Sequence, residues 1–322
     1  MSDETTYDAK GRMVYRYQYR TDAADTAEYT SEAGSAYSSG ARANLIRFAR
    51  SPAGLDEMVR LFDLDGVTRR PNRAGIYGVR HEHDSRGFIS RATGLDARDR
   101  PVLNKDGYAT IVHQRDDNGN ILGQSFLDAH GRLTRSSDGN ARNAFEYDGF
   151  GNRIGFGAFD EKGDRVSLKA GYSAWRAEFD RNGDRVRFAF FDAKDKSVLV
   201  EGVAGWWSRY NERGDETERA FFGLDAQPIL NKDGSAGWSA EYDARGNQTK
   251  LTYIGVDGKP VSIDRGYAGW TSQYDTQGKE IGREYFDSKE QYIHTMIVIE
   301  KVLSGSQAER LKIQSGDIIA KY

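Results

Sequence analysis

The chain has 322 residues and a formal net charge of −3 at pH 7, with 46 Lys and Arg against 49 Asp and Glu, so it lacks the basic excess of a nucleic-acid-binding protein. It contains no Cys, which excludes disulfides, a thiolate nucleophile and Cys-type zinc sites. Aromatic residues make up 12% of it, and 36 Gly accompany only 5 Pro, a composition that predicts an ordered protein with glycine turns and an aromatic core.

Residues 1–39 are predicted to be a partial repeat followed by a polar loop. Tyr7-Asp8-Ala9-Lys10-Gly11 carries the turn motif D-x-x-G that recurs along the rest of the chain, and residues 22–40 are small and polar. No signal peptide is visible, and no stretch of the sequence reaches the roughly 18 apolar residues of a membrane helix. The chain as given therefore predicts no membrane span, and the sequence leaves its compartment open.

Residues 40–74 allow two interpretations. Gly54 and Gly66 are twelve positions apart, as are two turn glycines in later repeats, which favours a hairpin. Leu55, Met58 and Phe62 have helical spacing, which favours a short helix instead. The hairpin is the preferred prediction.

A regular repeat of 32 residues begins at residue 75. A glycine opens each of seven blocks, at Gly75, Gly107, Gly139, Gly171, Gly202, Gly234 and Gly266, and one spacing is 31. Twelve positions into each block stands a second glycine, at Gly87, Gly119, Gly151, Gly183, Gly214, Gly246 and Gly278. Three residues before it stands Asp84, Asp116, Asp148, Asp180, Asn211, Asp243 or Asp275.

The D-x-x-G motif predicts a hairpin turn in every block. The Asp carboxylate caps a type I turn, and Gly takes the left-handed conformation that closes the hairpin through a bulge, so we expect positive φ at the seven glycines. Residues on both sides alternate between apolar and polar, as Trp238, Ala240 and Tyr242 do, which is typical of strands. The sequence thus predicts an all-β protein in which eight hairpin repeats over residues 40–293 stack into an open solenoid or a continuous twisted antiparallel sheet.

Four tryptophans occupy one offset in successive blocks: Trp175, Trp206, Trp238 and Trp270. Because they alternate in phase with aromatic residues on the same strands, we expect them to be stacked, largely buried core residues. A partly exposed platform for sugars or bases is the alternative. Trp207 is out of phase and is expected to be the more exposed aromatic.

Two Tyr-Asp-x-x-Gly-Asn strings, at 147–152 and 242–247, resemble the YD repeats of Rhs-type proteins. The resemblance covers about residues 40–293, although the strict 32-residue frame departs from the shorter, irregular Rhs repeat. Rhs-type repeats form shells around a toxin. The resemblance implies a β-hairpin repeat here, whereas this chain has few repeats and no toxin segment.

Residues 297–322 resemble the start of a bacterial PDZ domain, with Gly305-Ser306, an expected short helix at 307–311 and the Ser315-Gly316-Asp317-Ile318-Ile319 string. Lys312 stands where the family usually has a helix-ending Gly, and the groove-forming remainder is absent. The resemblance therefore implies an incomplete α+β segment, whose apolar residues we expect either to fold onto the last repeat or to pair between molecules.

Other candidate sites are weak. The turns at Asp116 and Asp180 look like calcium loops but lack the EF-hand spacing. His81, His83 and His113 could approach one another in adjacent repeats as metal ligands, but edge-of-core histidines are the preferred prediction. No catalytic, metal or cofactor-binding motif is predicted.

The predicted function is a non-enzymatic scaffold or protein-interaction module that presents an extended surface and spaces a PDZ domain. A shell or stalk fragment of an Rhs-like secreted polymorphic protein is the first alternative, and a carbohydrate-binding repeat surface is the second. The expected partner is a protein or peptide, with self-association through exposed strand edges as a further expectation and no nucleic-acid partner.

Overall fold

The fold was examined in a computed structural model, which describes residues 2–7, 13–19, 24–26, 45–63, 65–293, 296–298 and 318–320. These residues form β-strands joined by tight turns, with no helix among them, so none of them belongs to a helix that could cross a membrane. The chain divides into two compact units, residues 1–174 with 192–194 and residues 175–191 with 195–322.

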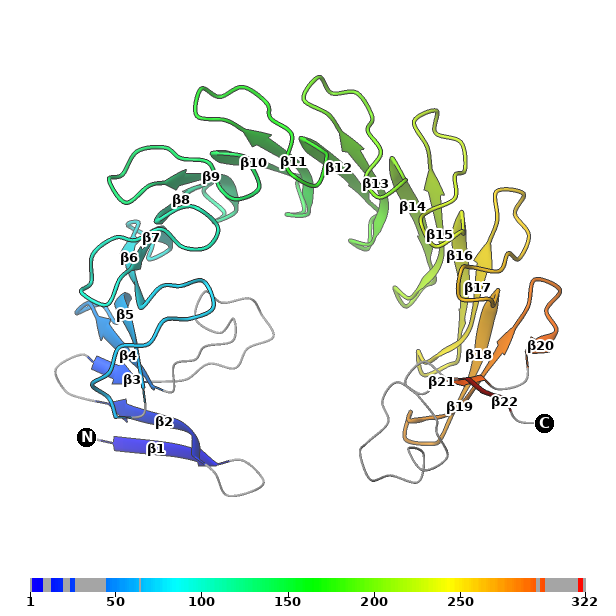
Figure 1. The fold of residues 1–322 in the computed structure, drawn as a ribbon, viewed down its shortest axis with the longest axis horizontal. Helices are drawn as coiled ribbons and strands as arrows, with labels where there is room; N and C mark the ends of the chain where they lie inside the picture. The colour runs from blue at the N-terminus through cyan, green and yellow to red at the C-terminus, as the bar shows by residue number, and fades with distance from the viewer. Residues whose placement is uncertain are drawn as a thin grey trace. The chain divides into compact units, whose positions relative to one another are not determined.

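The first unit is an antiparallel sheet in which each strand pairs with its neighbours in the sequence (Figure 1). Its strands are β1 (Ser2–Tyr7), β2 (Met13–Tyr19), β3 (Ala24–Thr26), β4 (Leu45–Arg50), β5 (Asp56–Phe62), β6 (Gly78–His83), β7 (Ile89–Leu95), β8 (Thr110–Arg115), β9 (Ile121–Leu127), β10 (Arg142–Tyr147) and β11 (Arg153–Phe159).

The second unit repeats this plan, with sequential antiparallel pairing from β13 to β20. Its strands are β12 (Ala174–Phe179), β13 (Arg185–Phe191), β14 (Gly205–Tyr210), β15 (Glu216–Phe222), β16 (Gly237–Tyr242), β17 (Gln248–Ile254), β18 (Gly269–Tyr274), β19 (Glu280–Phe286) and β20 (Tyr292–Ile293). The all-β prediction with regular antiparallel hairpins is confirmed, as is the β-hairpin repeat that the YD resemblance implies.

Residues 45–62 form a hairpin, so the helical alternative is wrong. Strand β4 pairs with β5 along its length, and Gly54 closes the turn with φ of 80°. Val59 and Leu61 are two residues apart in β5, as expected of side chains on one face of a strand, and both are buried. Cross-strand pairing at this site outweighs the helical spacing of Leu55, Met58 and Phe62.

The PDZ-like segment lies largely outside the described residues. Only β21 (Met296–Val298) and β22 (Ile318–Ala320) are described there, and they pair with each other in antiparallel fashion. The short helix expected at 307–311 falls outside the described residues, so nothing in the structure supports the PDZ resemblance.

Each regular repeat contains three turns, which are of one kind except for the turn between Val200 and Val203, where these two residues exchange both backbone hydrogen bonds. In the first, between the two strands of a hairpin, Gly246 N–H donates to Asp243 O at 3.1 Å, and Asp243 N–H donates to Asn247 O at 2.9 Å. A second turn follows the hairpin, as at Asp128 and Gly131, and a third precedes the next hairpin, as at Asn104 and Gly107. The glycine that opens a sequence block closes this third turn in six of the seven blocks, whereas Gly202 is a central residue of the shorter turn, and φ lies between 84° and 101° in all seven glycines.

Third turns of adjacent repeats are joined by backbone hydrogen bonds. Lys105 N–H donates to Ala74 O at 2.9 Å, and Lys169 N–H donates to Asp138 O at 3.0 Å. In the second unit, Asp264 N–H donates to Asp233 O at 3.2 Å. These bonds align the third turns in a row beside the strands and add to the strand pairing between repeats.

The sheet of the second unit has apolar side chains on both faces. One face bears the four tryptophans at the common offset, and we call it the ladder face. Ala189 and Trp207 lie on the opposite face, and Ala189, Ala204 and Phe222 form a buried cluster, against which Phe191 and Trp207 pack. Trp207 is therefore half-buried rather than exposed, because this cluster covers one side of its ring.

Candidate interaction surface

The four tryptophans of the ladder face belong to strands β12, β14, β16 and β18. Trp270 is buried at 8% exposure, whereas Trp175, Trp206 and Trp238 are half-buried. Three of the four indole rings thus keep part of their surface accessible to solvent.

The tryptophans do not stack directly on one another. Phe188 of β13 lies between two of them, with ring centroids 5.2 Å from Trp175 and 4.3 Å from Trp206 and both pairs stacked. Each repeat adds two strands at about 4.8 Å each, so equivalent residues of adjacent repeats are roughly 10 Å apart, too far for ring contact. The direct stacking predicted from the sequence is therefore wrong, and Phe188 of the intervening strand fills the gap between Trp175 and Trp206.

An arginine fills the next gap. Arg219 of β15 lies directly opposite Trp238, and its guanidinium carbon is 5.3 Å from the ring centroid of Trp206 and 5.8 Å from that of Trp238. Glu216 holds the guanidinium by two hydrogen bonds, of 2.9 and 3.0 Å. This pairing fixes a planar cation between two indole rings.

The same arrangement returns at the end of the unit. Arg283 of β19 lies 3.9 Å from the ring centroid of Trp270, and Glu280 binds it through two hydrogen bonds, of 2.9 and 3.0 Å. We call the alternating series the Trp–Arg row: Trp175, Phe188, Trp206, Arg219, Trp238, Leu251, Trp270 and Arg283.

The residues between the tryptophans carry no motif in the sequence. Their distance to the next tryptophan differs between repeats: Phe188 stands 18 residues before Trp206, and Arg219 stands 19 before Trp238. This position holds Phe, Arg or Leu in different repeats, so no residue type marks it. Only the strand register identifies it.

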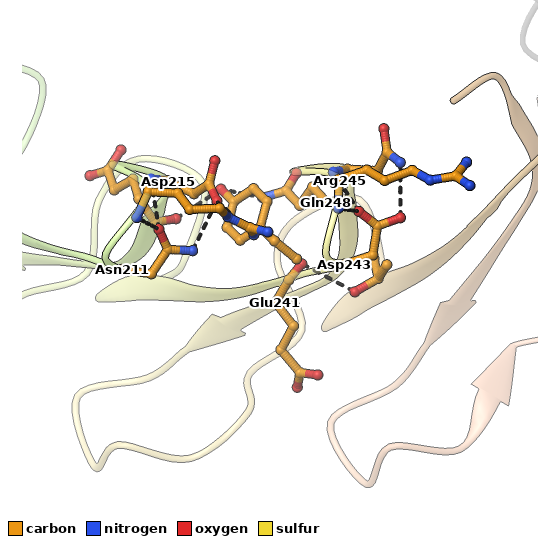
Figure 2. A network of polar contacts seen from close by, with 11 residues as sticks. Asn211, Asp215, Glu241, Asp243, Arg245 and Gln248 are labelled. Carbon is orange, nitrogen blue, oxygen red and sulfur yellow. Dashed lines mark hydrogen bonds and ion pairs between the residues drawn. The ribbon is translucent and has the colours of Figure 1, made fainter. Parts of the chain in front are cut away.

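The predicted turn residues lie along the edge formed by the first turns. Figure 2 shows two of these turns, with Asn211 bonded to Asp215 in one and Asp243 in the other. Asp243 Oδ1 accepts from the N–H groups of Arg245 and Asn247, and its Oδ2 accepts from Asn247 Nδ2 at 2.8 Å. The side-chain hydrogen bond from Asn247 is the main cause that lowers the pKa of Asp243.

Equivalent carboxylates accept backbone N–H groups in the same way at Asp84, Asp148, Asp180 and Asp275. All seven first-turn glycines have positive φ, between 80° and 89°. The bulge that the motif predicts occurs as a register shift at the end of each hairpin, for example between Glu241 and Tyr242. The turn chemistry predicted from D-x-x-G is thus present in full.

The tyrosine before each turn has a role that the sequence did not indicate. Tyr242 OH donates to Glu216 O of the preceding repeat at 2.8 Å, and Tyr274 OH donates to Gln248 O at 2.9 Å. Burial raises the pKa of Tyr242, and the carboxylates of Asp215 and Glu216 raise it further. The Tyr of the Tyr-Asp string therefore ties adjacent repeats together.

Two of the candidate metal residues, Asp116 and His81, have hydrogen-bond partners in the local structure. Asp116 accepts from the backbone and side chain of Asn120, as expected of a turn cap. His81 is buried with Nδ1 at 3.1 Å from Asp56 O, and burial lowers its pKa. Within residues 45–63 and 65–293, no group of three or more His, Asp or Glu side chains is placed to hold a metal ion.

No protein-family model and no curated protein matches the chain. Solved structures to which it is similar include TcdB2-TccC3 without its hypervariable C-terminal region, at 11% identity over 99% of this chain with a TM-score of 0.36. The Photorhabdus luminescens Tc holotoxin pore aligns at 11% identity over 88% with a TM-score of 0.35, and a porin-like protein from Bacteroides uniformis aligns at 9% over 84% of this chain and 92% of its own, with a TM-score of 0.26. The chain spans 16% and 13% of the two Tc chains, and at such TM-scores no role follows from the likeness.

Proposed function

We propose that the chain is a non-enzymatic repeat scaffold that binds a protein partner through the Trp–Arg row. The observation that carries the proposal is Arg219, held between Trp206 and Trp238 by Glu216 on a face where the rings stay partly accessible. Trp and Arg supply much of the binding energy in protein interfaces. A guanidinium already fixed by a carboxylate loses little side-chain entropy when a partner binds.

The chemistry of the chain favours a protein over a nucleic acid. Its net charge of −3 gives no general attraction for phosphates. The arginines of the row are each neutralised by a glutamate at 2.9 Å, which leaves flat, weakly hydrated surfaces rather than a basic groove.

The finer role that we propose is that of a spacer. The repeats would hold a domain of PDZ type, suggested by the resemblance of residues 297–322, at a fixed distance. The alternative role, a shell or stalk fragment of an Rhs-like secreted protein, rests on the YD strings alone.

Self-association through the edge of β19 is part of this proposal. Among the described residues, β19 pairs beyond β18 only at Tyr285 and Phe286, which leaves Glu280–Glu284 as an open edge. Light scattering at several concentrations, on the full chain and on a chain ending at Tyr292, measures the contribution of the C-terminal segment. Equal masses that rise with concentration in both chains would remove residues 293–322 as the association site and leave the edge of β19, and monomer masses at every concentration would refute self-association.

The experiment that tests the row is quantitative capture from extracts of the source organism by immobilised full-length protein. We expect Arg219→Glu and Trp238→Ala each to lose the same set of captured proteins. The matched control is Arg209→Glu, because Arg209 is exposed on the opposite face of the same hairpin and pairs there with Glu218. Identical capture by all four proteins would refute the proposed role of the row.

A further inference from the structure

One repeat of the first unit has a polar residue where both of its neighbours have a tyrosine. The residue after the third-turn glycine is Tyr108 in one block and Tyr172 two blocks later, but Asn140 in the block between them. Asn143 occupies the tryptophan offset of that same block. Two carboxamide side chains thus stand between Tyr108 and Tyr172, at one position where both neighbouring repeats have a ring and at another where they have Ile111 and Trp175.

A cleft of about 400 Å³ lies at this place. Tyr108 and Phe126 form one wall, with ring centroids 4.7 Å apart, and Phe156 and Tyr172 form the other, with centroids 6.3 Å apart. The volume falls in the range of roughly 300–1,000 Å³ that is typical of small-molecule sites. The cleft therefore combines aromatic walls with enough room for a small ring.

The floor of the cleft is an ordered chain of polar groups. Ser136 Oγ donates to Asn140 Oδ1 at 2.7 Å, and Asn140 Nδ2 donates to Asn143 Oδ1 at 2.5 Å. Asn143 Nδ2 then donates to Gln124 Oε1 at 3.1 Å. Asn140 is only 3% exposed, so these bonds fix the floor, while Asn143 retains a second N–H and a second lone pair for an external group.

Two carboxylates stand at the mouth. Asp106 and Asp138 are exposed third-turn residues that line the cleft. Burial raises the pKa of Tyr108 and of Tyr172, and the charge of Asp106 acts on the first and that of Asp138 on the second in the same direction. Each acid therefore lies near one aromatic wall.

These features discriminate among classes of ligand. The two carboxylates repel phosphates and other anions, which disfavours nucleotides. Strand addition by a peptide is blocked on this side, because the N–H groups of Ser137 and Lys169 already bond to Asp106 O and Asp138 O. An uncharged ligand with an apolar ring face and several hydroxyl groups fits both the rings and the polar floor.

We propose that the cleft between Tyr108 and Tyr172 binds a neutral pyranose residue of a glycan, in the space of the aromatic ring that the repeat lacks at Asn140. The C–H face of the sugar packs against the aromatic walls, and its hydroxyls bond to Asn143 and to the carboxylates of Asp106 and Asp138. This site lies in the first unit and uses no residue of the Trp–Arg row, so it stands or falls independently of the proposed protein partner.

The test is binding of the full-length protein to a printed array of neutral and anionic glycans. We expect retention on neutral glycans, reduced about tenfold or more by Tyr172→Ala and by Asn140→Tyr, which fills the cleft with the ring found in the neighbouring repeats. Asp138→Asn, an exposed conservative change, is expected to weaken binding severalfold without affecting folding, which circular dichroism checks.

The matched control is Tyr267→Ala, which removes the equivalent ring from the last repeat and is expected to leave binding unchanged. The absence of any retention on neutral glycans would overturn the proposal. So would retention on anionic glycans alone, or a loss of binding in Trp238→Ala equal to that in Tyr172→Ala, which would transfer the site to the Trp–Arg row.

Discussion

Ala226 and Gly258 occupy the same position of the second turn in consecutive repeats, with φ of 60° and 76°. A β-carbon in this left-handed region costs about 1–2 kcal/mol, and glycine loses roughly 0.5–1 kcal/mol more backbone entropy on folding than alanine. We therefore expect Ala226→Gly to stabilise the protein by about 0.5–1 kcal/mol and Gly258→Ala to destabilise it by a similar amount. Urea unfolding monitored by tryptophan fluorescence measures both.

The effect of Gly258→Ala on stability can be assigned to the backbone because no other group lies near the added atom. An added β-carbon at Gly258 meets no atom within 4 Å, so backbone conformation is the only property that changes. Gly149, which has no positive φ and equally open surroundings, serves as the control, and Gly149→Ala is expected to stabilise the protein by about 0.4–1 kcal/mol because only the backbone entropy changes. Equal effects at Gly149 and Gly258 would contradict the conformational explanation.

The turn aspartates make stability depend on pH. The backbone N–H of Arg132 is the main cause that lowers the pKa of Asp128 from 3.8 to about 2, with its guanidinium acting in the same direction. A carboxyl whose pKa is lower in the folded state stabilises the fold fully above the unfolded value, and this stabilisation is lost as the pH falls through the folded value. We expect the urea midpoint to be constant above about pH 5 and to fall between about pH 4 and pH 2.

The variant Asp128→Asn removes the carboxylate charge but keeps a side-chain oxygen that can accept the hydrogen bonds of the turn. Asn keeps a side-chain oxygen for the turn, as Asn211 does at the equivalent position of a first turn. The variant should therefore be less stable than the parent at pH 7 and lose less stability on acidification. A parallel loss in both proteins between pH 5 and pH 2 would show that Asp128 does not contribute.

At the scale of the strands, Phe188 links two repeats. Its ring is 7% exposed and stacks between Trp175 and Trp206. We expect Phe188→Ala to cost about 3–5 kcal/mol, and Phe188→Leu to cost no more than about 1.5 kcal/mol because an apolar side chain still fills the gap. The free energy of urea unfolding measures both changes. A cost for Phe188→Ala below that for Phe188→Leu would show that the stack is not structural.

The first turns could be predicted from sequence because Asp or Asn and Gly keep fixed places in every regular repeat. The third turns could not, because their first residue varies: Asn104 and Asn231 cap the turn, whereas Leu168 and Ile263 have no polar side chain to give a turn signal. The common position of the four tryptophans in the repeat could likewise be read from the sequence, but the residues that lie between them could not. Their place depends on the register between strands of different hairpins, which no local pattern specifies.

At the scale of the whole molecule, the repeats add nearly independent increments of stability. In such an array each unit contacts only its neighbours, so removing one whole unit shortens the array without breaking it. Deletion of residues 234–265 joins Asp233 to Gly266 and restores an Asn-x-x-Gly third turn after Asn231. The same deletion brings Arg219 opposite Trp270 in place of Trp238, because both tryptophans hold the same register position.

We therefore expect the chain lacking residues 234–265 to fold and to unfold with a smaller dependence on urea concentration, in proportion to the buried surface that is lost. Deletion of residues 250–265 removes half as many residues but cuts β17 and leaves β16 without most of its partner. It should be the more damaging change, since an unpaired strand exposes both its backbone groups and the indole of Trp238. Far-ultraviolet circular dichroism and urea unfolding compare the two chains. Stability that follows the number of residues removed, rather than the integrity of the repeat, would show that the hairpin repeat is not the unit of folding.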